Sequence, residues 1–187
     1  VTDSTCDLPD SVIKELNITV IPLFINIGDE GLLDGVDISR KAFYQNLPDY
    51  PVHPTTATPG IGAFKKIYES LAAGGASEII SIHVAESLSA TVNVARTAAA
   101  EINGVPGQLS LGTGFRVETA ARMARAGKSR EEILDALDDL LGRTFVAAQL
   151  DSLEYLKRSG RMNAFMSGLG TMLQVIPILT MQNGQPS

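Results

Sequence analysis

Residues 81–95 read Ser81-Ile82-His83-Val84-Ala85-Glu86-Ser87-Leu88-Ser89-Ala90-Thr91-Val92-Asn93-Val94-Ala95, and they join a strand pattern to a helix pattern. They continue an apolar run from Glu78 to Val84, whose alternation and β-branched residues are typical of a strand. The stretch ends in a helical pattern, and a loop of small hydroxyl residues lies between the two. A strand that passes into a helix in this way indicates an α/β fold.

The start of this helix is a candidate site for an anion. The first backbone N–H groups of a helix have no partner within the helix, and the helix dipole adds partial positive charge beside them. With the hydroxyl groups of Ser89 and Thr91 nearby, a carboxylate or a phosphate is the natural ligand. The alternative is that Ser87 or Ser89 only caps the helix, because serine is a preferred N-cap residue.

A second hydroxyl-rich loop precedes another predicted helix. It reads His53-Pro54-Thr55-Thr56-Ala57-Thr58-Pro59-Gly60, and apolar residues then recur at helical spacing over residues 61–71 until Gly74-Gly75. Loops that follow the strands of a parallel sheet gather at its carboxyl edge, where open α/β folds bind their ligands. We therefore expect the two loops to converge on one ligand site.

The remaining patterns complete an α/β chain. Strands are expected near residues 1–2, 18–27, 78–84, 144–150 and 176–181, and helices near 9–16, 40–47, 61–71, 91–104, 115–125, 130–141 and 154–158. A glycine-rich loop is expected at 108–114, capping boxes at 129–132 and 151–154, and a hairpin turn at Asn183-Gly184. This order predicts an open, mainly parallel sheet with helices on both faces over residues 1–143. A second α/β domain, present only in part, is expected over residues 144–187.

One connection is too short for this alternation. A strand is expected between the helices that flank it, yet Gly104-Val105-Pro106-Gly107 is too short and too broken to form one. We therefore expect a break or a displaced connection around Asn103 to Gln108.

Composition and charge restrict the class of protein. The chain has 187 residues, 44% of them hydrophobic, with a net charge of −6 and a pI near 4.9, which argues against nonspecific attraction to nucleic acid. No apolar run is long enough to span a bilayer, and no secretory signal is visible. Cys6 is the only cysteine, which excludes an internal disulfide and fits a reducing cytoplasm. Together with His53 and His83, Cys6 does not have the spacing of a zinc site. We therefore expect a globular cytoplasmic protein.

The usual nucleotide and serine-hydrolase motifs are absent. The sequence contains neither G-x-G-x-x-G after a strand nor G-x-x-x-x-G-K-[ST], and Gly112-Thr113-Gly114 reads only as a turn. There is no G-x-S-x-G nucleophile elbow either. A Ser–His–Asp arrangement stays open, because four residues could meet in space: Asp3, Ser4, Ser89 and His83.

Arg161 is the cation of greatest interest. It follows a glycine at the end of a short basic helix and precedes an apolar, glycine-rich segment. One interpretation is a solvated side chain that the helix C-terminus favours. If Arg161 instead faces the two hydroxyl loops, its guanidinium group can clamp a carboxylate.

Six short motifs are spread over the whole chain. They are Thr2-Asp3-Ser4-Thr5-Cys6-Asp7-Leu8-Pro9, Pro22-Leu23, Pro54-Thr55-Thr56-Ala57-Thr58-Pro59, Ser87-Leu88-Ser89-Ala90-Thr91, Leu153-Glu154-Tyr155-Leu156-Lys157 and Ser159-Gly160-Arg161-Met162. In this order and spacing they resemble the DegV family of bacterial fatty-acid-binding proteins, which includes the fatty-acid-binding subunits of fatty acid kinase. Each motif alone is weak, but together they make the resemblance specific.

The resemblance implies an α/β domain followed by a second one, with a long-chain fatty acid bound between them. Thr56 and Ser89 would hydrogen-bond the fatty acid carboxylate, and Arg161 would help to hold that polar network. The same motifs supply further ligand-site candidates, which are Asp3, Ser4, Thr55, Ala57, Ala90 and Thr91. The resemblance implies no cofactor, no metal and no turnover of the ligand by the protein itself. In the kinase system, the bound fatty acid is presented to a separate fatty acid kinase, which makes an acyl phosphate.

The chain departs from the family pattern at four places. Ala90 stands where the family usually has glycine, which adds a Cβ atom at the start of the helix. Ala57 and Thr58 replace the usual Ser and Gln. The strand that normally precedes a segment like Gln108-Leu109-Ser110 is missing, and a histidine of the family's polar site lies beyond Ser187.

Two other functions stay open from the sequence. The protein could be a small α/β serine hydrolase or acyl-transfer enzyme that uses Ser4 or Ser89 as its nucleophile. It could also be a regulatory interaction module in which the ligand is structural. Acyl chain length, saturation, the kinase partner and the oligomeric state have no readable signal in the sequence.

Overall fold

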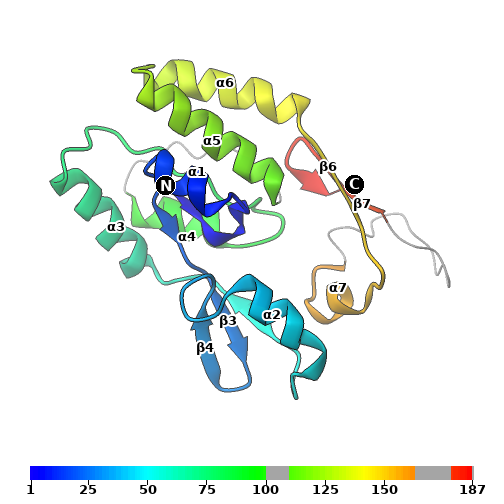
Figure 1. The fold of residues 1–187 in the computed structure, drawn as a ribbon. Helices are drawn as coiled ribbons and strands as arrows, with labels where there is room; N and C mark the ends of the chain where they lie inside the picture. The colour runs from blue at the N-terminus through cyan, green and yellow to red at the C-terminus, as the bar shows by residue number, and fades with distance from the viewer. Residues whose placement is uncertain (100–109, 163–177, 187) are drawn as a thin grey trace.

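A small parallel sheet lies between two groups of helices (Figure 1). The computed structural model describes residues 1–99, 110–162 and 178–186. Its strands are β1 Thr2–Asp3, β2 Val20–Ile21, β3 Phe24–Ile27, β4 Glu30–Leu33, β5 Thr55–Ala57, β6 Phe145–Gln149, β7 Ile178–Gln182 and β8 Gln185–Pro186. Its α-helices are α1 Asp10–Glu15, α2 Arg40–Asn46, α3 Ile61–Ala73, α4 Thr91–Ala98, α5 Leu111–Arg125, α6 Arg130–Arg143 and α7 Glu154–Arg158. The predicted α/β class is confirmed.

β1 is the central strand of the parallel layer. It pairs in parallel with β2, and Thr2 forms a parallel bridge with Ile82. The strand predicted at residues 78–84 is reduced to this one bridge, which the hydrogen bond from the Ile82 N–H to the Val1 carbonyl oxygen (3.0 Å) supports. Because these segments run in parallel, their carboxyl ends lie at one edge of the layer.

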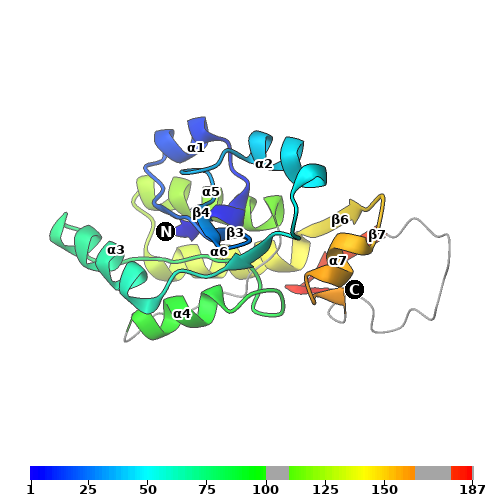
Figure 2. The ribbon, with the colours of Figure 1, turned by 90° about the horizontal axis from the view of Figure 1, so that it is seen from below.

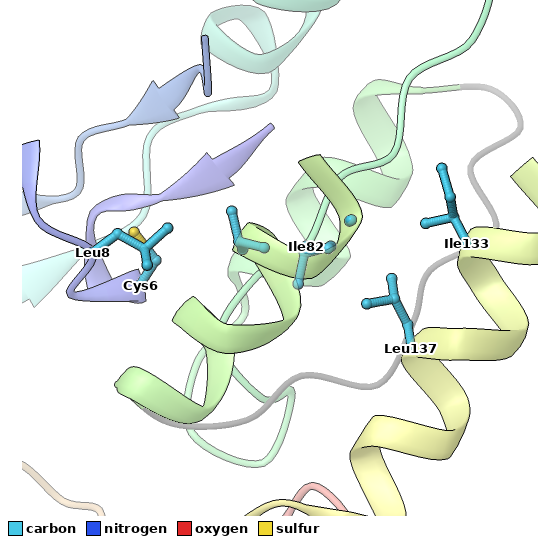
Figure 3. Packing of buried hydrophobic residues seen from close by; sticks show 7 residues of the cluster. Cys6, Leu8, Ile82, Ile133 and Leu137 are labelled. Carbon is cyan, nitrogen blue, oxygen red and sulfur yellow. The ribbon is translucent and has the colours of Figure 1, made fainter. Parts of the chain in front are cut away.

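Helices cover both faces of this layer, as predicted. On one face, α1, α5 and α6 surround the buried side chains of Cys6, Leu8, Ile82, Val117, Ala120, Ile133 and Leu137. Figure 3 shows Cys6, Leu8, Ile82, Ile133 and Leu137 of this cluster. On the other face, α3 and α4 contribute to a second cluster formed by Ile21, Phe64, Tyr68, Ala95 and Ala98. Full burial of each large apolar side chain contributes about 1.5–3 kcal/mol. These two clusters are therefore the main source of stability for the described part of residues 1–143, called the first unit.

Local signals placed most helix ends correctly. The Ser39 hydroxyl accepts a hydrogen bond from the Ala42 N–H at the start of α2, and the capping box at residues 129–132 is present at the start of α6. Asn17, with a φ of 51°, follows the end of α1 as expected. The reciprocal capping box predicted at residues 151–154 is wrong, because Leu153 is the N-cap of α7 and only the Ser152 hydroxyl accepts a hydrogen bond, from the Glu154 N–H (3.1 Å).

The strand predicted at residues 18–27 is divided into β2 and β3. Pro22 follows β2 directly and has no N–H group to donate to a strand ladder. β3 then belongs to a separate antiparallel sheet, in which β4 lies on one side and β5 on the other. The second hydroxyl loop is therefore partly a strand, since Thr55–Ala57 is β5. Parallel pairing between strands of the described residues is confined to β1 and β2, and two isolated parallel bridges join Thr2 to Ile82 and Asp34 to Ile38.

The glycine-rich loop predicted at residues 108–114 is wrong from residue 111 onward. α5 begins at Leu111, and Gly112 and Gly114 lie in its first turns. A Cβ atom on Gly114 would come within 2.5 Å of the Cys6 carbonyl oxygen. Glycine therefore allows this helix to pack closely against the turn after β1, and it does not interrupt the helix here.

In the described part of residues 144–187, called the second unit, a small antiparallel sheet lies with the short helix α7. β7 pairs with β6 and β8, and the predicted hairpin turn is confirmed by the positive φ angles of Asn183 (52°) and Gly184 (74°). Buried Met181 packs against Val84, Ala85 and Leu88 of the first unit. Both views show β6, β7 and α7 together at one side of the first unit (Figures 1 and 2). The domain boundary after residue 143 stays a prediction.

The connection predicted to be broken or displaced, at Asn103 to Gln108, lies outside the described residues. Within residues 1–99, 110–162 and 178–186, no helix has both the length and the apolar character needed to cross a membrane.

We expect Gly114→Ala to destabilise the protein by about 1–3 kcal/mol, because the new methyl group overlaps backbone that cannot move independently. The free energy of unfolding, measured by urea denaturation, tests this.

Gly142→Ala is the matched control. Gly142 also lies inside a helix, but no atom lies within 4 Å of its added Cβ atom, so this change should stabilise by about 0.5–1 kcal/mol. Equal effects of the two substitutions would contradict the close approach at Gly114.

Candidate functional site

A cavity of about 770 Å³ lies between the two units. Its size falls within the range of about 300–1,000 Å³ that is usual for small-molecule sites. Apolar side chains from both units line it, including Leu23, Val84, Leu88, Leu150, Leu156 and Leu179. Thr56, Ser89 and Arg161 all line this cavity, so the three predicted carboxylate ligands are brought together.

A second cavity, of about 590 Å³, contains none of the predicted residues. It lies at the opposite, amino-terminal edge of the parallel layer, beside Ile18 and Ile80. Ligands of α/β proteins bind at the carboxyl ends of the strands, so we assign the candidate site to the cavity between the units.

Arg161 faces both hydroxyl loops. Its Nε donates to the Leu88 carbonyl oxygen (2.9 Å), and its Nη2 donates to the Thr56 hydroxyl oxygen (3.5 Å). Among the described residues no carboxylate forms a salt bridge with Arg161. A half-buried guanidinium group without an internal counterion, at the wall of an apolar cavity, is suited to an anionic headgroup. The interpretation of Arg161 as a purely solvated helix-end residue is therefore wrong.

Ser89 lies beside the start of α4 but is not its N-cap. Ala90 occupies the N-cap position, with no side-chain capping bond, and it is exposed and outside the cavity lining. The Ser89 hydroxyl oxygen is 2.8 Å from that of Thr91 and accepts a longer hydrogen bond from the Thr91 N–H (3.4 Å). Thr91 is fully buried and is bonded in turn to Thr58 (3.0 Å). Ser89 is thus the member of this hydroxyl group that reaches the cavity.

The other candidates lie at different positions. Thr55 and Ala57 flank Thr56 in β5, where alternate side chains point to opposite faces, and neither lines the cavity. Ser4 is almost fully buried, and its hydroxyl oxygen accepts a hydrogen bond from the Leu23 N–H (3.2 Å). Thr55, Ala57 and Ser4, like Ala90, are therefore not placed to hold a ligand in this cavity.

Asp3 is fully buried at the end of β1 and is also not a direct ligand. One carboxylate oxygen accepts from the N–H and hydroxyl groups of Thr5 (3.0 and 2.5 Å). The other oxygen accepts from the Val84 N–H (3.1 Å) and lies 2.9 Å from Nδ1 of His83. Burial alone would raise the pKa of the Asp3 carboxyl group, but the hydrogen bond and charge of His83 and the bonds from Thr5 outweigh it, so this pKa lies below its ordinary value.

The structure does contain a Ser–His–Asp arrangement, but with Ser81 as the serine. The Ser81 hydroxyl oxygen lies 2.7 Å from Nε2 of His83, and Tyr68 bonds to the same hydroxyl (3.0 Å). Ser81, His83 and Asp3 are each at most 4% exposed, so no substrate reaches them. Neither Ser4 nor Ser89 is hydrogen-bonded to a histidine in the described part of the chain, so the serine-hydrolase alternative finds no general base there.

Two polar residues of the site were missed by the sequence analysis. Thr5 lines the cavity and is held by Asp3, and Thr58 supports Thr91 from the second loop. Both lie within the quoted motifs, one residue after Ser4 and two residues after Thr56. Their place within these motifs was the only signal in the sequence for a role at the site, because the contacts that bring them there form only in the folded protein.

We expect Asp3→Asn to lower the free energy of unfolding at pH 7 by about 1–3 kcal/mol, because it removes a buried acceptor of several hydrogen bonds. The folded-state pKa of Asp3 is lowered, so its stabilisation is complete above the unfolded-state pKa of about 3.9 and is lost as the pH falls through the folded-state value. Urea denaturation between pH 7 and pH 3 should therefore show that the free energy of unfolding falls less steeply with falling pH in the variant than in the wild-type protein.

Asp139→Asn serves as the control for this pH series. Asp139 is exposed and pairs with Arg143 on the surface of α6, so its loss should change stability by no more than about 0.5 kcal/mol. If the free energy of unfolding of Asp3→Asn falls with falling pH as steeply as that of the wild-type protein, the assigned role of Asp3 would be contradicted.

Fold and cavity together define a two-unit α/β protein with a cavity at the carboxyl edge of its parallel layer. A profile described as "Uncharacterised protein, DegV family" matches residues 1–187. The chain is 33% identical over 191 aligned residues to a DegV domain-containing protein of Halalkalibacterium halodurans, covering 98% of this chain and 67% of that protein. The chain belongs to the DegV family, and it spans about two thirds of the length of that relative.

Solved structures of the family have the same fold. A DegV family protein from Thermus thermophilus, described by its fatty acid binding, superposes with a TM-score of 0.85 at 32% identity, covering 99% of this chain and 68% of that one. A stearic acid-binding protein from Eubacterium ventriosum has a TM-score of 0.87 at 25% identity, with coverage of 99% and 67%. The predicted family is thereby confirmed, and fatty acid binding is a property of these structural neighbours.

Proposed function

We propose that the protein binds a long-chain fatty acid in the cavity between its two units. The carboxylate would accept hydrogen bonds from Ser89 and Thr56 and pair with Arg161, while the acyl chain lies against the leucine-rich wall. The observation that carries the proposal is the Arg161 guanidinium group, which faces both hydroxyl loops without a carboxylate partner among the described residues. The fatty acid binding of structurally similar DegV proteins supports the same ligand class.

The acyl chain supplies most of the affinity in this proposal. A saturated chain of about 15 methylene groups, at roughly 0.8 kcal/mol each, offers on the order of 12 kcal/mol of transfer free energy before the costs of association. The polar wall then has to orient the headgroup and neutralise its charge. Two hydroxyl groups and one guanidinium group are sufficient for both tasks.

The proposal extends to a carrier role. We infer that the protein does not itself turn over the fatty acid but presents it, in the cytoplasm, to a separate fatty acid kinase. This part rests on the resemblance to the fatty-acid-binding subunits of fatty acid kinase. It agrees with a site in which the described histidines do not contact the candidate carboxylate ligands.

Native mass spectrometry of the purified protein, followed by organic extraction and lipid analysis, tests the ligand directly. We expect one fatty acid per chain, because Thr56, Ser89 and Arg161 all line one cavity. Folded protein that is reproducibly empty and does not take up added fatty acid would overturn the proposal.

Arg161→Ala and Ser89→Ala should each weaken fatty acid binding by about ten- to a hundredfold, since a hydrogen bond to a charged group contributes about 1.5–3 kcal/mol. Titration of the delipidated protein with palmitic acid, followed by isothermal calorimetry, measures the change.

Arg158→Ala is the matched control for Arg161. Arg158 is exposed, pairs with Glu154 within α7 and does not line the cavity, so binding should be unchanged. Thermal unfolding of all variants separates loss of binding from loss of fold. Parallel loss of both in Arg161→Ala would contradict a direct role at the headgroup.

A further inference from the structure

Three hydroxyl groups form a continuous chain behind the candidate carboxylate site. The hydroxyl oxygens of Thr58 and Thr91 are 3.0 Å apart, and those of Thr91 and Ser89 are 2.8 Å apart. Thr58 precedes α3, Thr91 is the first residue of α4, and Ser89 reaches the cavity. This chain of hydroxyl groups thus runs from one hydroxyl loop to the other and ends at the cavity.

Burial restricts the directions of these hydrogen bonds. Thr91 is 0% exposed, so water does not reach its hydroxyl group, and it has a single proton to share between two neighbours. If it accepted from both neighbours, its own buried proton would have no partner, which is unfavourable by about 1–3 kcal/mol. The favoured arrangement is therefore one in which it donates to one neighbour and accepts from the other. The hydroxyl groups therefore donate in one common direction. In the forward direction Thr58 donates to Thr91 and Thr91 donates to Ser89, and in the reverse direction Ser89 donates to Thr91 and Thr91 donates to Thr58.

The direction decides what Ser89 offers to a ligand. In the reverse direction, the Ser89 proton points inward to Thr91 and is not available in the cavity. In the forward direction, Ser89 accepts from the Thr91 hydroxyl group and also from the Thr91 N–H (3.4 Å), so both of its lone pairs are occupied. Its proton is then free to be donated to the ligand.

We infer that Thr91, with Thr58 behind it, is a positioning residue that turns the Ser89 proton toward the cavity and makes the site select an acceptor-only headgroup. This inference rests on the proposed function and adds a specificity determinant to it. A carboxylate accepts the outward proton of Ser89 and holds the chain in the forward direction. An alcohol carries a proton of its own and no charge, so it gains less from this arrangement.

A comparison of two ligands of equal chain length, palmitic acid and hexadecan-1-ol, tests the inference. Affinities are measured by competition against a fluorescent fatty acid on delipidated protein. We expect Thr91→Val to weaken binding of palmitic acid about three- to tenfold and of hexadecan-1-ol less than about twofold, since the charged carboxylate gains more from the Ser89 donor than a neutral hydroxyl group does. Thr91→Ser, which keeps the hydroxyl group, should restore both affinities to within about twofold.

A double-mutant cycle with Ser89→Ala identifies the residue through which Thr91 acts. If Thr91 acts through Ser89, adding Thr91→Val to Ser89→Ala should change palmitic acid binding by less than about twofold. Thr97→Val is the matched control, because Thr97 lies on the exposed face of the same helix and bonds to the Asn93 carbonyl oxygen. It should leave both affinities unchanged.

Thr58→Val is a second variant that keeps the inference testable if Thr91→Val does not fold. It should weaken palmitic acid about twofold and leave hexadecan-1-ol unchanged, because it removes one cooperative step of the chain. Parallel loss of acid and alcohol binding, additive effects in the cycle, or no effect of Thr91→Val would each overturn the inference while leaving the proposed function intact. Wild-type protein that does not bind palmitic acid would overturn the proposed function itself.

Discussion

The buried carboxylate of Asp3 ties the end of the central strand to the loop that leads to the candidate site. Its two oxygens are hydrogen-bonded to different segments, one to Thr5 and the other to His83 and the Val84 N–H. A fully buried carboxylate is unfavourable unless such partners surround it. The same bonds that satisfy Asp3 therefore hold the carboxyl ends of two neighbouring segments in a defined position, and the cavity opens beside them.

The site is composite, and packing between the two units completes it. Met181 of the second unit is buried against Leu88 of the first, and the Arg161 side chain donates to the Leu88 carbonyl oxygen. Apolar burial supplies the driving force for this contact, and the hydrogen bond sets the orientation of the guanidinium group. The cation is thus brought over Thr56 and beside the loop of Ser89 only when the units are assembled.

The helices could be predicted well from the sequence because their signals are local. The spacing of Phe64 and Tyr68 and the capping box before α6 each depend on residues a few positions apart. The strands were less accurate, since β1 and β2 have two residues each and owe their structure to pairing with distant segments. The start of α5 was misplaced because Gly114, which reads as a loop signal, is required for contact with Cys6.

The α/β class, most helix positions, the two hydroxyl loops and the family could all be predicted from the sequence, because periodicity, caps and ordered motifs are local features of the chain. Which candidates share a site depends on tertiary packing. Thr56 and Arg161 are 105 residues apart, and Asp3 and His83 are 80 residues apart, yet each pair is in contact. Such contacts depend on how the parallel layer and the second unit pack, and no local pattern distinguishes the Ser89 that reaches the cavity from the Thr91 that is buried behind it.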